Sequence, residues 1–187
     1  MSCVVGLMFE GEVWMGGDSY GSIKGVSYPG CLPKFCRRAE PNGAEMLLGG
    51  CGTDRFNNAM RYNLQIPAFS EGDDIHRYLN CDFTDAIRAS LRNAGLVKVE
   101  DGQEYHENSL LLAFKGALYY MGSDFNFTST PSRDFLVIGS GEDFAMGALH
   151  AGLHLTKLSA QAIVTSALQA ASSLGTTVAP PFHVEKL

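Results

Sequence analysis

The sequence is poor in charged residues and contains no long hydrophobic run. Charged residues make up 18% of the 187 residues and hydrophobic residues 45%, a balance typical of a folded chain and not of a disordered one. No segment approaches the roughly 20 consecutive apolar residues of a membrane-spanning helix. Residues 1–14 also lack the basic stretch and the apolar run of a signal peptide. We therefore expect a cytoplasmic protein with no membrane partner.

Basic residues are outnumbered by acidic ones. Lys and Arg total 14 against 20 Asp and Glu, so the formal net charge is -6. A surface with this charge repels phosphate backbones, and we expect no nucleic-acid partner. Two glycine-rich pieces, GGCGTD and GSGED, fit neither the P-loop pattern nor G-x-G-x-x-G between a strand and a helix. No cofactor is therefore predicted.

The cysteine pattern excludes a disulfide scaffold. Their number is odd, and no C-x-x-C pair occurs, so neither a disulfide framework nor a structural zinc site is supported. His150 and His154 lie four residues apart on an expected helix, but no third ligand accompanies them, and we predict no metal site. We expect reduced thiols, several of them buried, at Cys3, Cys31, Cys36, Cys51 and Cys81.

Residues 1–187 have the length of one domain, and no linker or repeat divides them. Segments 3–9 and 12–16 are apolar and joined by a turn at Gly11, which predicts a β-hairpin at the start of the chain. Residues 20–33, rich in Gly and Pro, are predicted to form a loop. Further strands are expected at 45–48, at 109–121 as a hairpin turning at Lys115-Gly116, at 135–139 and at 182–187.

Two pairs of helices are expected between these strands. Residues 73–93 carry the strongest signal, and Ser159 suits the N-cap of the last helix. Helices are also predicted at 53–64, 141–154 and 159–173. Hairpin strands followed by paired helices, twice over, favour an α+β layered domain over an alternating βαβ one. Within 73–93 the apolar positions recur every four residues, at Ile75, Leu79, Phe83, Ile87 and Leu91.

The start of the chain is its most unusual feature. Ser2 directly follows Met1, and a small residue at this position favours removal of the methionine. Removal would leave a free α-amine beside the Ser2 hydroxyl. An α-amine has an ordinary pKa of about 7.7–8.0, so part of it is neutral near pH 7 and can accept the hydroxyl proton. On that basis we expect activation to rest on Met1 removal.

The opening SCVVGLMFEGEVWMGGDS resembles that of the proteasome-type N-terminal nucleophile (Ntn) hydrolases, the proteasome β subunits and HslV peptidases. In that family the mature chain starts at Thr and reaches a Gly-Asp pair after two strands. Ser2 matches the nucleophile and Gly17-Asp18 match the pair. Lys34, in CLPKFCRR, matches the family's lysine. These residues keep the family's order and rough spacing.

Later segments extend the resemblance over essentially the whole chain. LLGGCGTDRF is similar to the family's next strand and glycine-rich turn, and FLVIGSGEDFAMGAL to its I-G-S-G segment, with Ser140 and Gly141 at the key places. LSAQAIVTSALQAASS resembles the last long helix. The resemblance implies a four-layer αββα sandwich, which the order of predicted strands and helices fits.

The resemblance also implies a role for each matching residue. Ser2 would attack a peptide carbonyl, with its α-amine as base. Lys34 would place a positive charge beside the nucleophile, and Asp18 would pair with Lys34. The backbone N–H of Gly52 would be the oxyanion donor, and Ser140, followed by Gly141, would position the amine. A pocket lined by residues 21–53 would select the substrate.

Family resemblance further implies a self-assembled homo-oligomeric ring, a polypeptide substrate and an ATP-dependent unfoldase as partner. Apolar helices such as 73–93 would supply the contacts between subunits.

Two departures from the family keep other hypotheses open. The nucleophile is Ser instead of Thr, and the aspartate that the family often has near the end of its last helix is replaced by Ser172-Ser173-Leu174-Gly175. The same fold could be a catalytically idle structural subunit. It could also be an amidohydrolase acting on small amides. A remote fourth hypothesis makes Cys3 the nucleophile after further trimming.

Overall fold

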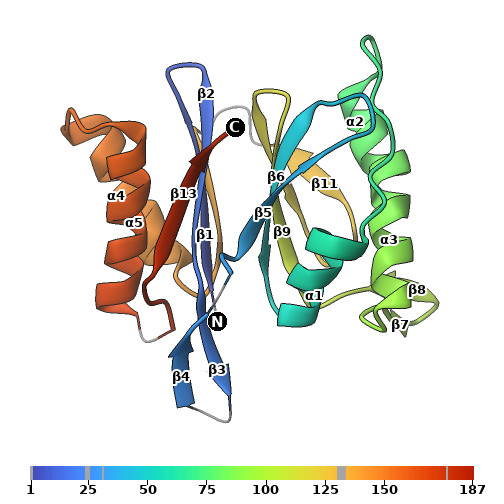
Figure 1. Ribbon diagram of the computed structural model, residues 1–187, viewed down its shortest axis with the longest axis horizontal. Coiled ribbons are helices and arrows are strands. Elements are labelled where there is room, and N and C mark those ends of the chain that lie inside the picture. The colour runs from blue at the N-terminus through green and yellow to red at the C-terminus, as the bar shows by residue number, and fades with distance from the viewer. Residues whose placement is uncertain (1, 24–25, 31, 130–133, 176) are drawn as a thin grey trace.

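β1 (Cys3–Phe9) is apolar on both of its faces, and this property fixes the layering of the fold. Cys3, Val5 and Leu7 contact helices on one side, whereas Val4 contacts a second sheet on the other. A strand of this kind must be covered on both faces. The computed structural model accordingly has two sheets packed face to face with a helical layer outside each (Figure 1). The predicted four-layer αββα sandwich is confirmed.

The two sheets are antiparallel throughout. The structure describes residues 2–23, 26–30, 32–129, 134–175 and 177–187. The four-stranded sheet has the order β12 (Phe135–Gly139), β1, β2 (Glu12–Asp18) and β13 (Phe182–Lys186). The five-stranded sheet has the order β11 (Phe127–Ser129), β10 (Ala117–Met121), β9 (Ser109–Phe114), β6 (Glu45–Cys51) and β5 (Phe35–Ala39).

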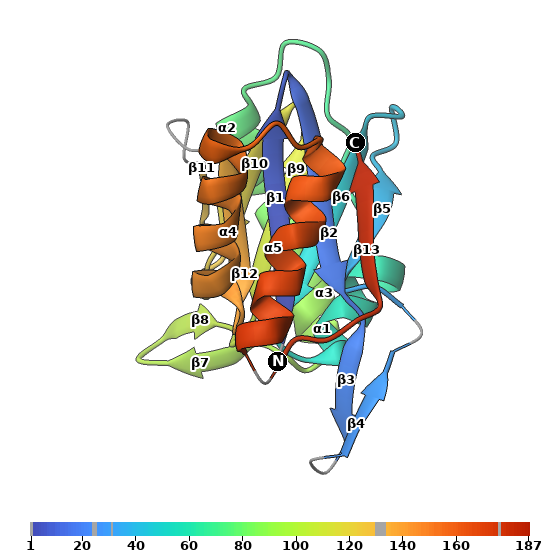
Figure 2. The ribbon, with the colours of Figure 1, turned by 90° about the vertical axis from the view of Figure 1, so that its left-hand side faces the viewer.

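Each outer layer is helical, as predicted. The helices α4 (Glu142–Leu155) and α5 (Ala160–Leu174) lie side by side over the four-stranded sheet (Figure 2). Ser159 caps α5 by accepting a hydrogen bond from the N–H of Ala162. Among the described residues, no helix is long and apolar enough to cross a membrane. The other layer consists of α1 (Asp54–Asn58), η1 (Ala59–Asn63), α2 (Ile75–Tyr78), η2 (Leu79–Phe83) and α3 (Thr84–Asn93).

The four-residue apolar spacing within 73–93 has a structural explanation. η2 is a π-helical segment between α2 and α3, and a π turn holds more residues than an α turn. Positions four apart therefore stay on one face instead of drifting around the helix. Leu79, Phe83, Ile87 and Leu91 are all buried against the five-stranded sheet.

This packing corrects one expectation about assembly. The apolar face of 73–93 is used within the chain's own core, so it is not available for contacts between subunits. The exposed large apolar side chains of the outer layers lie mainly on or beside α4 and α5, at Phe144, Leu155, Leu158 and Leu174.

The prediction of a loop at 20–33 is wrong in part. β3 (Tyr20–Ile23) and β4 (Val26–Pro29) form a two-stranded hairpin that projects from the end of the sandwich where β1 begins (Figures 1 and 2). A second small hairpin, β7 (Lys98–Glu100) and β8 (Gln103–Tyr105), follows α3 and was not predicted either. Neither hairpin has the apolar alternation that marks a strand in a core.

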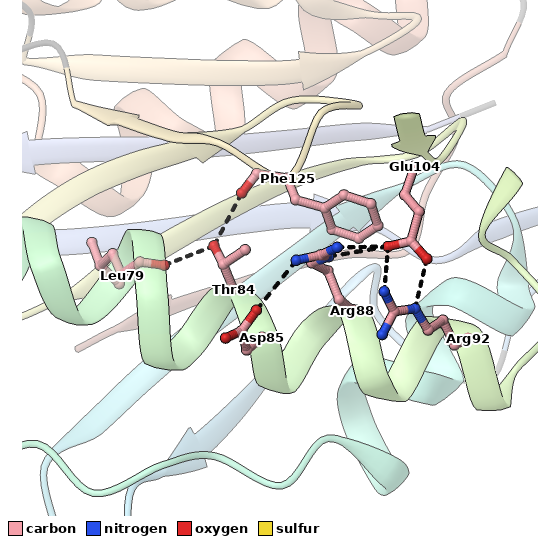
Figure 3. Close-up of polar contacts among 7 residues, drawn as sticks. All are labelled: Leu79, Thr84, Asp85, Arg88, Arg92, Glu104 and Phe125. Atoms are coloured by element: carbon pink, nitrogen blue, oxygen red, sulfur yellow. Dashed lines mark hydrogen bonds and ion pairs between the residues drawn. The ribbon is translucent and has the colours of Figure 1, made fainter. Parts of the chain in front are cut away.

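The β7–β8 hairpin is tied to α3 by one carboxylate (Figure 3). Glu104 accepts hydrogen bonds from Arg92 at 2.7 and 2.6 Å and from Arg88 at 3.2 and 2.8 Å. Asp85 adds a contact to Arg88 at 3.3 Å. Two guanidinium partners on one carboxylate favour its charged form. Hydrogen bonds from Arg92 and Arg88 accordingly lower the pKa of Glu104 to about 2.

We predict that Glu104→Gln destabilises the fold in a pH-dependent way. Because the folded pKa of Glu104 lies below the ordinary 4.5, its stabilisation is present above that value and is lost as the pH falls towards about 2. Wild type should unfold at a higher temperature than the variant near neutral pH, and the two should converge in acid. Glu71→Gln, on an exposed side chain outside the ion pairs of the described residues, is the matched control. A gap that persists in strong acid would contradict the assignment.

Candidate active site

The β1–β2 hairpin brings the start of the chain to Asp18. In this register Val4 pairs with Gly17, so Cys3 lies beside Asp18 and its N–H donates to Asp18 Oδ1 at 2.8 Å. The other carboxylate oxygen accepts from the Tyr20 N–H at 3.2 Å. Asp18 is fully buried. Burial raises its pKa, although the Cys3 N–H and the charge of Lys34 act in the opposite direction.

Lys34 is positioned by its backbone. Its N–H donates to the Asp18 carbonyl and its own carbonyl accepts from the Gly50 N–H, both at 2.9 Å. These bonds link the end of β2 to β6 and hold Lys34 between the two sheets. Its residue exposure is only 8%, so its charge acts through a medium that screens weakly.

The predicted ion pair between Asp18 and Lys34 is not formed. Lys34 Nζ instead lies 3.5 Å from Asp54 Oδ1, and Asp54 is a largely exposed residue at the start of α1. No contact within ion-pair distance joins Asp18 and Lys34 in the structure as described. Both carboxylate oxygens of Asp18 accept hydrogen bonds from backbone N–H groups. Asp18 therefore acts on Lys34 through the charge of its carboxylate and through the backbone hydrogen bond between the two residues.

Ser140 holds the main-chain nitrogen of Ser2. The Ser2 N–H donates to Ser140 Oγ, and the Ser140 hydroxyl donates to the Ser2 carbonyl, both at 3.3 Å. Gly139, at the end of β12, makes this approach possible. Its φ is +102°, and a Cβ there would overlap the Ser2 carbonyl oxygen. Only glycine tolerates both conditions.

Gly141 has a structural position next to Ser140. It precedes α4 as the N-cap, and its carbonyl accepts from the Ala145 N–H at 3.1 Å. A Cβ there would press against Cys3, Ala171 and Val178 at 3.2 Å or less. Gly141 therefore lets the start of α4, the end of α5 and the beginning of β1 meet closely.

Thr177 was missed by the sequence reasoning. Its Oγ1 lies 2.8 Å from Ser140 Oγ, so a second hydroxyl stands behind the one that contacts Ser2. The resemblance implied an aspartate near the end of the last helix, where this chain has Ser172-Ser173-Leu174-Gly175. Thr177 lies just beyond the end of α5. Nothing local in the sequence distinguishes this threonine, because its partner is 37 residues away.

Gly52 lies in a turn that is shaped by Asn108. Its φ is +143°, and a Cβ at this position would overlap the Asn108 side chain. Asn108 Oδ1 accepts from the Thr53 N–H at 3.0 Å, and Thr53 caps α1. His106, buried between two phenylalanine rings, accepts from the Asn108 N–H at 3.2 Å. The side chain of Asn108, itself held by His106, thus keeps the Gly52 turn in one conformation.

Two buried thiols flank Ser2. The Ser2 hydroxyl forms a hydrogen bond with Cys51, yet burial dominates and raises the pKa of the Cys51 thiol to about 12. Burial also raises the pKa of Cys3, with the neighbouring Cys51 and Asp18 acting in the same direction. A thiol must lose its proton to act as a nucleophile. This environment therefore argues against the hypothesis that Cys3 is the nucleophile.

A pocket of about 220 Å³ opens beside Lys34. It overlaps the range 21–53 that the resemblance indicated and also includes Ser19 and residues of α1 and η1. Arg61 is fixed there by donating to the Pro33 and Phe35 carbonyls at 2.7 and 2.9 Å. The pocket is lined by residues that include Tyr28, Leu32, Lys34, Asp54, Asn58 and Arg61.

Together these contacts place a hydroxyl, a main-chain nitrogen, a buried lysine and a glycine turn in one region between the two sheets. The residues that the sequence singled out are all there, namely Ser2, Asp18, Lys34, Gly52, Ser140 and Gly141. His150 and His154 lie elsewhere, on α4, with ring centroids 4.6 Å apart. Within the described part of the chain, no three His, Cys, Asp or Glu residues gather as metal ligands.

Comparison with solved structures identifies the fold. BPH from Thiobacillus denitrificans is 16% identical, with 99% of this chain and 97% of BPH covered and a TM-score of 0.80. Eukaryotic HslV from Trypanosoma brucei is 15% identical, with 98% of each chain covered and a TM-score of 0.68. Anbu from Pseudomonas aeruginosa is 15% identical, with 100% of this chain and 81% of Anbu covered and a TM-score of 0.66.

These likenesses show that the chain has the proteasome-like Ntn-hydrolase fold. The sequence matches no family model and no curated protein.

We predict that thiol alkylation follows burial. In the native protein at mildly alkaline pH, iodoacetamide should modify exposed Cys81 well before Cys3, Cys36 and Cys51, which are buried. In urea these differences should disappear. Peptide mass spectrometry at several times measures each rate. Native modification of Cys3 as fast as that of Cys81 would contradict the site described above and restore Cys3 as a candidate nucleophile.

Proposed function

We propose that this protein is an Ntn peptidase in which Ser2 becomes the first residue when Met1 is removed. The observation that carries the proposal is the hydrogen bond between the Ser2 main-chain nitrogen and Ser140, because it fixes the atom that would serve as the base. The likeness in fold to HslV and BPH over nearly the whole chain supports the same reading.

The reaction proceeds in two stages. The Ser2 hydroxyl oxygen bonds to the carbonyl carbon of the substrate amide, its proton passes to the neutral α-amine, and the carbonyl electrons move to the oxygen. When the C–N bond breaks, the resulting ammonium returns the proton to the leaving nitrogen, which leaves an ester on Ser2. Water then attacks that ester and gives a proton to the amine. The C–O bond to Ser2 breaks, the ammonium returns the proton to the Ser2 oxygen, and the acid product departs.

Lys34 stabilises this sequence electrostatically. Close to the reacting oxygen, its buried ammonium would favour the developing negative charge and would need no reorganisation during the reaction. Asp18 places Lys34 through the main chain and offsets the cost of burying its charge. The Gly52 N–H is proposed as the donor to the substrate oxygen, with Asn108 keeping the turn in its conformation.

The substrate is proposed to be an unfolded polypeptide. The pocket beside Lys34 has about the size of one side chain, and Lys34 is part of its lining. We propose a homo-oligomeric ring in the cytoplasm that encloses the sites, with an ATP-dependent unfoldase as partner. The Pseudomonas aeruginosa Anbu complex is a helical assembly, which supports self-association. The exposed apolar side chains on and beside α4 and α5 offer a surface for it.

We predict that Ser2→Ala abolishes hydrolysis of fluorogenic peptides, whereas Ser173→Ala, an exposed position at the end of α5, leaves it unchanged. Intact mass should show loss of Met1 in both proteins. Epoxomicin, which is bound in a Thiobacillus denitrificans BPH structure, is a further probe that should bind the wild type and not Ser2→Ala. Retention of Met1 without hydrolysis would refute the proposal and favour an idle subunit, and equal hydrolysis by Ser2→Ala would refute Ser2 as the nucleophile.

Replacing the charged residues should separate their roles. Lys34→Met should lower kcat by about 10²- to 10³-fold, because it removes a preorganised charge. Asp54→Asn should cost about fivefold or less, since its exposed pair with Lys34 contributes little. Asp18→Asn should resemble Lys34→Met in kcat, and thermal unfolding of each variant checks that it is folded. A decrease in kcat for Asp54→Asn as large as that for Lys34→Met would mean that Asp54 is the carboxylate on which the function of Lys34 depends.

A further inference from the structure

The segment after α5 returns across the site and is held at several points. Thr177 contacts Ser140, and Val178 is buried against Gly141. Further along, the Pro181 carbonyl accepts from both the N–H and the hydroxyl of Ser19, each at 3.2 Å. The chain then enters β13, which pairs with β2. Thr177 is therefore positioned by its contact with Ser140 and by the anchored segment that follows it.

Counting hydrogen bonds at Ser140 assigns the direction of its contact with Thr177. The Ser140 hydroxyl has one proton, and it donates this proton to the Ser2 carbonyl. Its oxygen has two acceptor sites. One of them takes the Ser2 N–H. The remaining contact, at 2.8 Å, allows a donor on either side, and it completes this set when the Thr177 hydroxyl donates to Ser140. With this bond Ser140 has its full set of partners.

We propose that Thr177 is a positioning residue for the amine of Ser2, an inference that rests on the proposed function. By donating to Ser140, Thr177 fixes the Ser140 hydroxyl as an acceptor of the amine N–H. The amine lone pair then stays available for the hydroxyl proton of Ser2. Without Thr177, only the long bond to the Ser2 carbonyl holds the Ser140 proton, so the hydroxyl can rotate and donate into that lone pair, which would occupy the base.

A neutral hydroxyl at this point has a consequence that a carboxylate would not have. A carboxylate can only accept, so it would take the proton of Ser140, and its negative charge would favour the ammonium form of the Ser2 amine. The threonine orients the amine and adds no charge. The departure from the family's aspartate is thus compatible with an active site, and it sets the pH range in which the amine is neutral.

The test uses the full-length protein after intact mass has established removal of Met1. Thr177→Val keeps the shape and removes the hydroxyl, and it should lower kcat by about tenfold with little change in KM. Thr177→Ser should restore most of the rate. Thr165→Val makes the same replacement on α5, where the hydroxyl only donates to the Gln161 carbonyl, and should match wild type. A Thr177→Val enzyme as fast as Thr165→Val overturns the proposal.

A second measurement does not depend on peptide hydrolysis. Periodate cleaves an N-terminal serine only when its α-amine is free and unprotonated, so the pH dependence of this cleavage, followed by intact mass, reports the amine itself. Thr177→Asp should move the profile to higher pH by about one unit, because an anion nearby favours the ammonium. Thr177→Asn, of the same shape and without charge, should not move it.

The outcomes separate the two proposals. A shift in the Thr177→Asp profile together with an inactive wild type would support the position of Thr177 and refute the peptidase. Hydrolysis by the wild type with no shift in the profile would support the peptidase and overturn the role of Thr177. If Met1 is retained, periodate does not react and both proposals fail.

Discussion

One buried carboxylate determines where the chain begins. Asp18 is fully enclosed, and an enclosed charge is costly unless donors surround it. Its partners are the N–H groups of Cys3 and Tyr20 and the field of Lys34. The bond from the Cys3 N–H fixes the start of β1. The bond from the Tyr20 N–H fixes the direction in which the β3–β4 hairpin extends from the end of β2. The backbone of Asp18 also places Lys34, so the spacing of the whole candidate site depends on this residue.

The sequence allowed the layered architecture to be predicted because the core elements have clear periodicity. β1 and β9 are continuous apolar runs, and the helix at 73–93 repeats an apolar residue every fourth position. The hairpins β3–β4 and β7–β8 escaped prediction because they bury little apolar surface and so carry no periodic signal. The π segment is consistent with the four-residue repeat of apolar positions. That repeat is longer than the 3.6-residue period of an α-helix, so it would not stay on one face of an α-helix over several turns.

The site was predicted only in part, for a different reason. Ser2, Asp18, Lys34 and Ser140 were found through the order and spacing of motifs. Their partners depend on how distant segments close against each other, as with Thr177 behind Ser140 and Asn108 behind Gly52. The ion pair expected between Asp18 and Lys34 illustrates the limit. The family resemblance implied that the two residues would pair, but it did not show that backbone N–H groups would occupy both carboxylate oxygens.

The position of β1 also has a consequence for the order of events during synthesis. This first strand lies between β2 and β12, and β13 at the far end of the chain completes the sheet. Ser2 is only 1% exposed in the finished fold. The strand that leaves the ribosome first must therefore wait for the segments that leave it last. During that interval Ser2 is exposed to solvent, and it becomes enclosed only when β12 pairs with β1 and Ser140 contacts it.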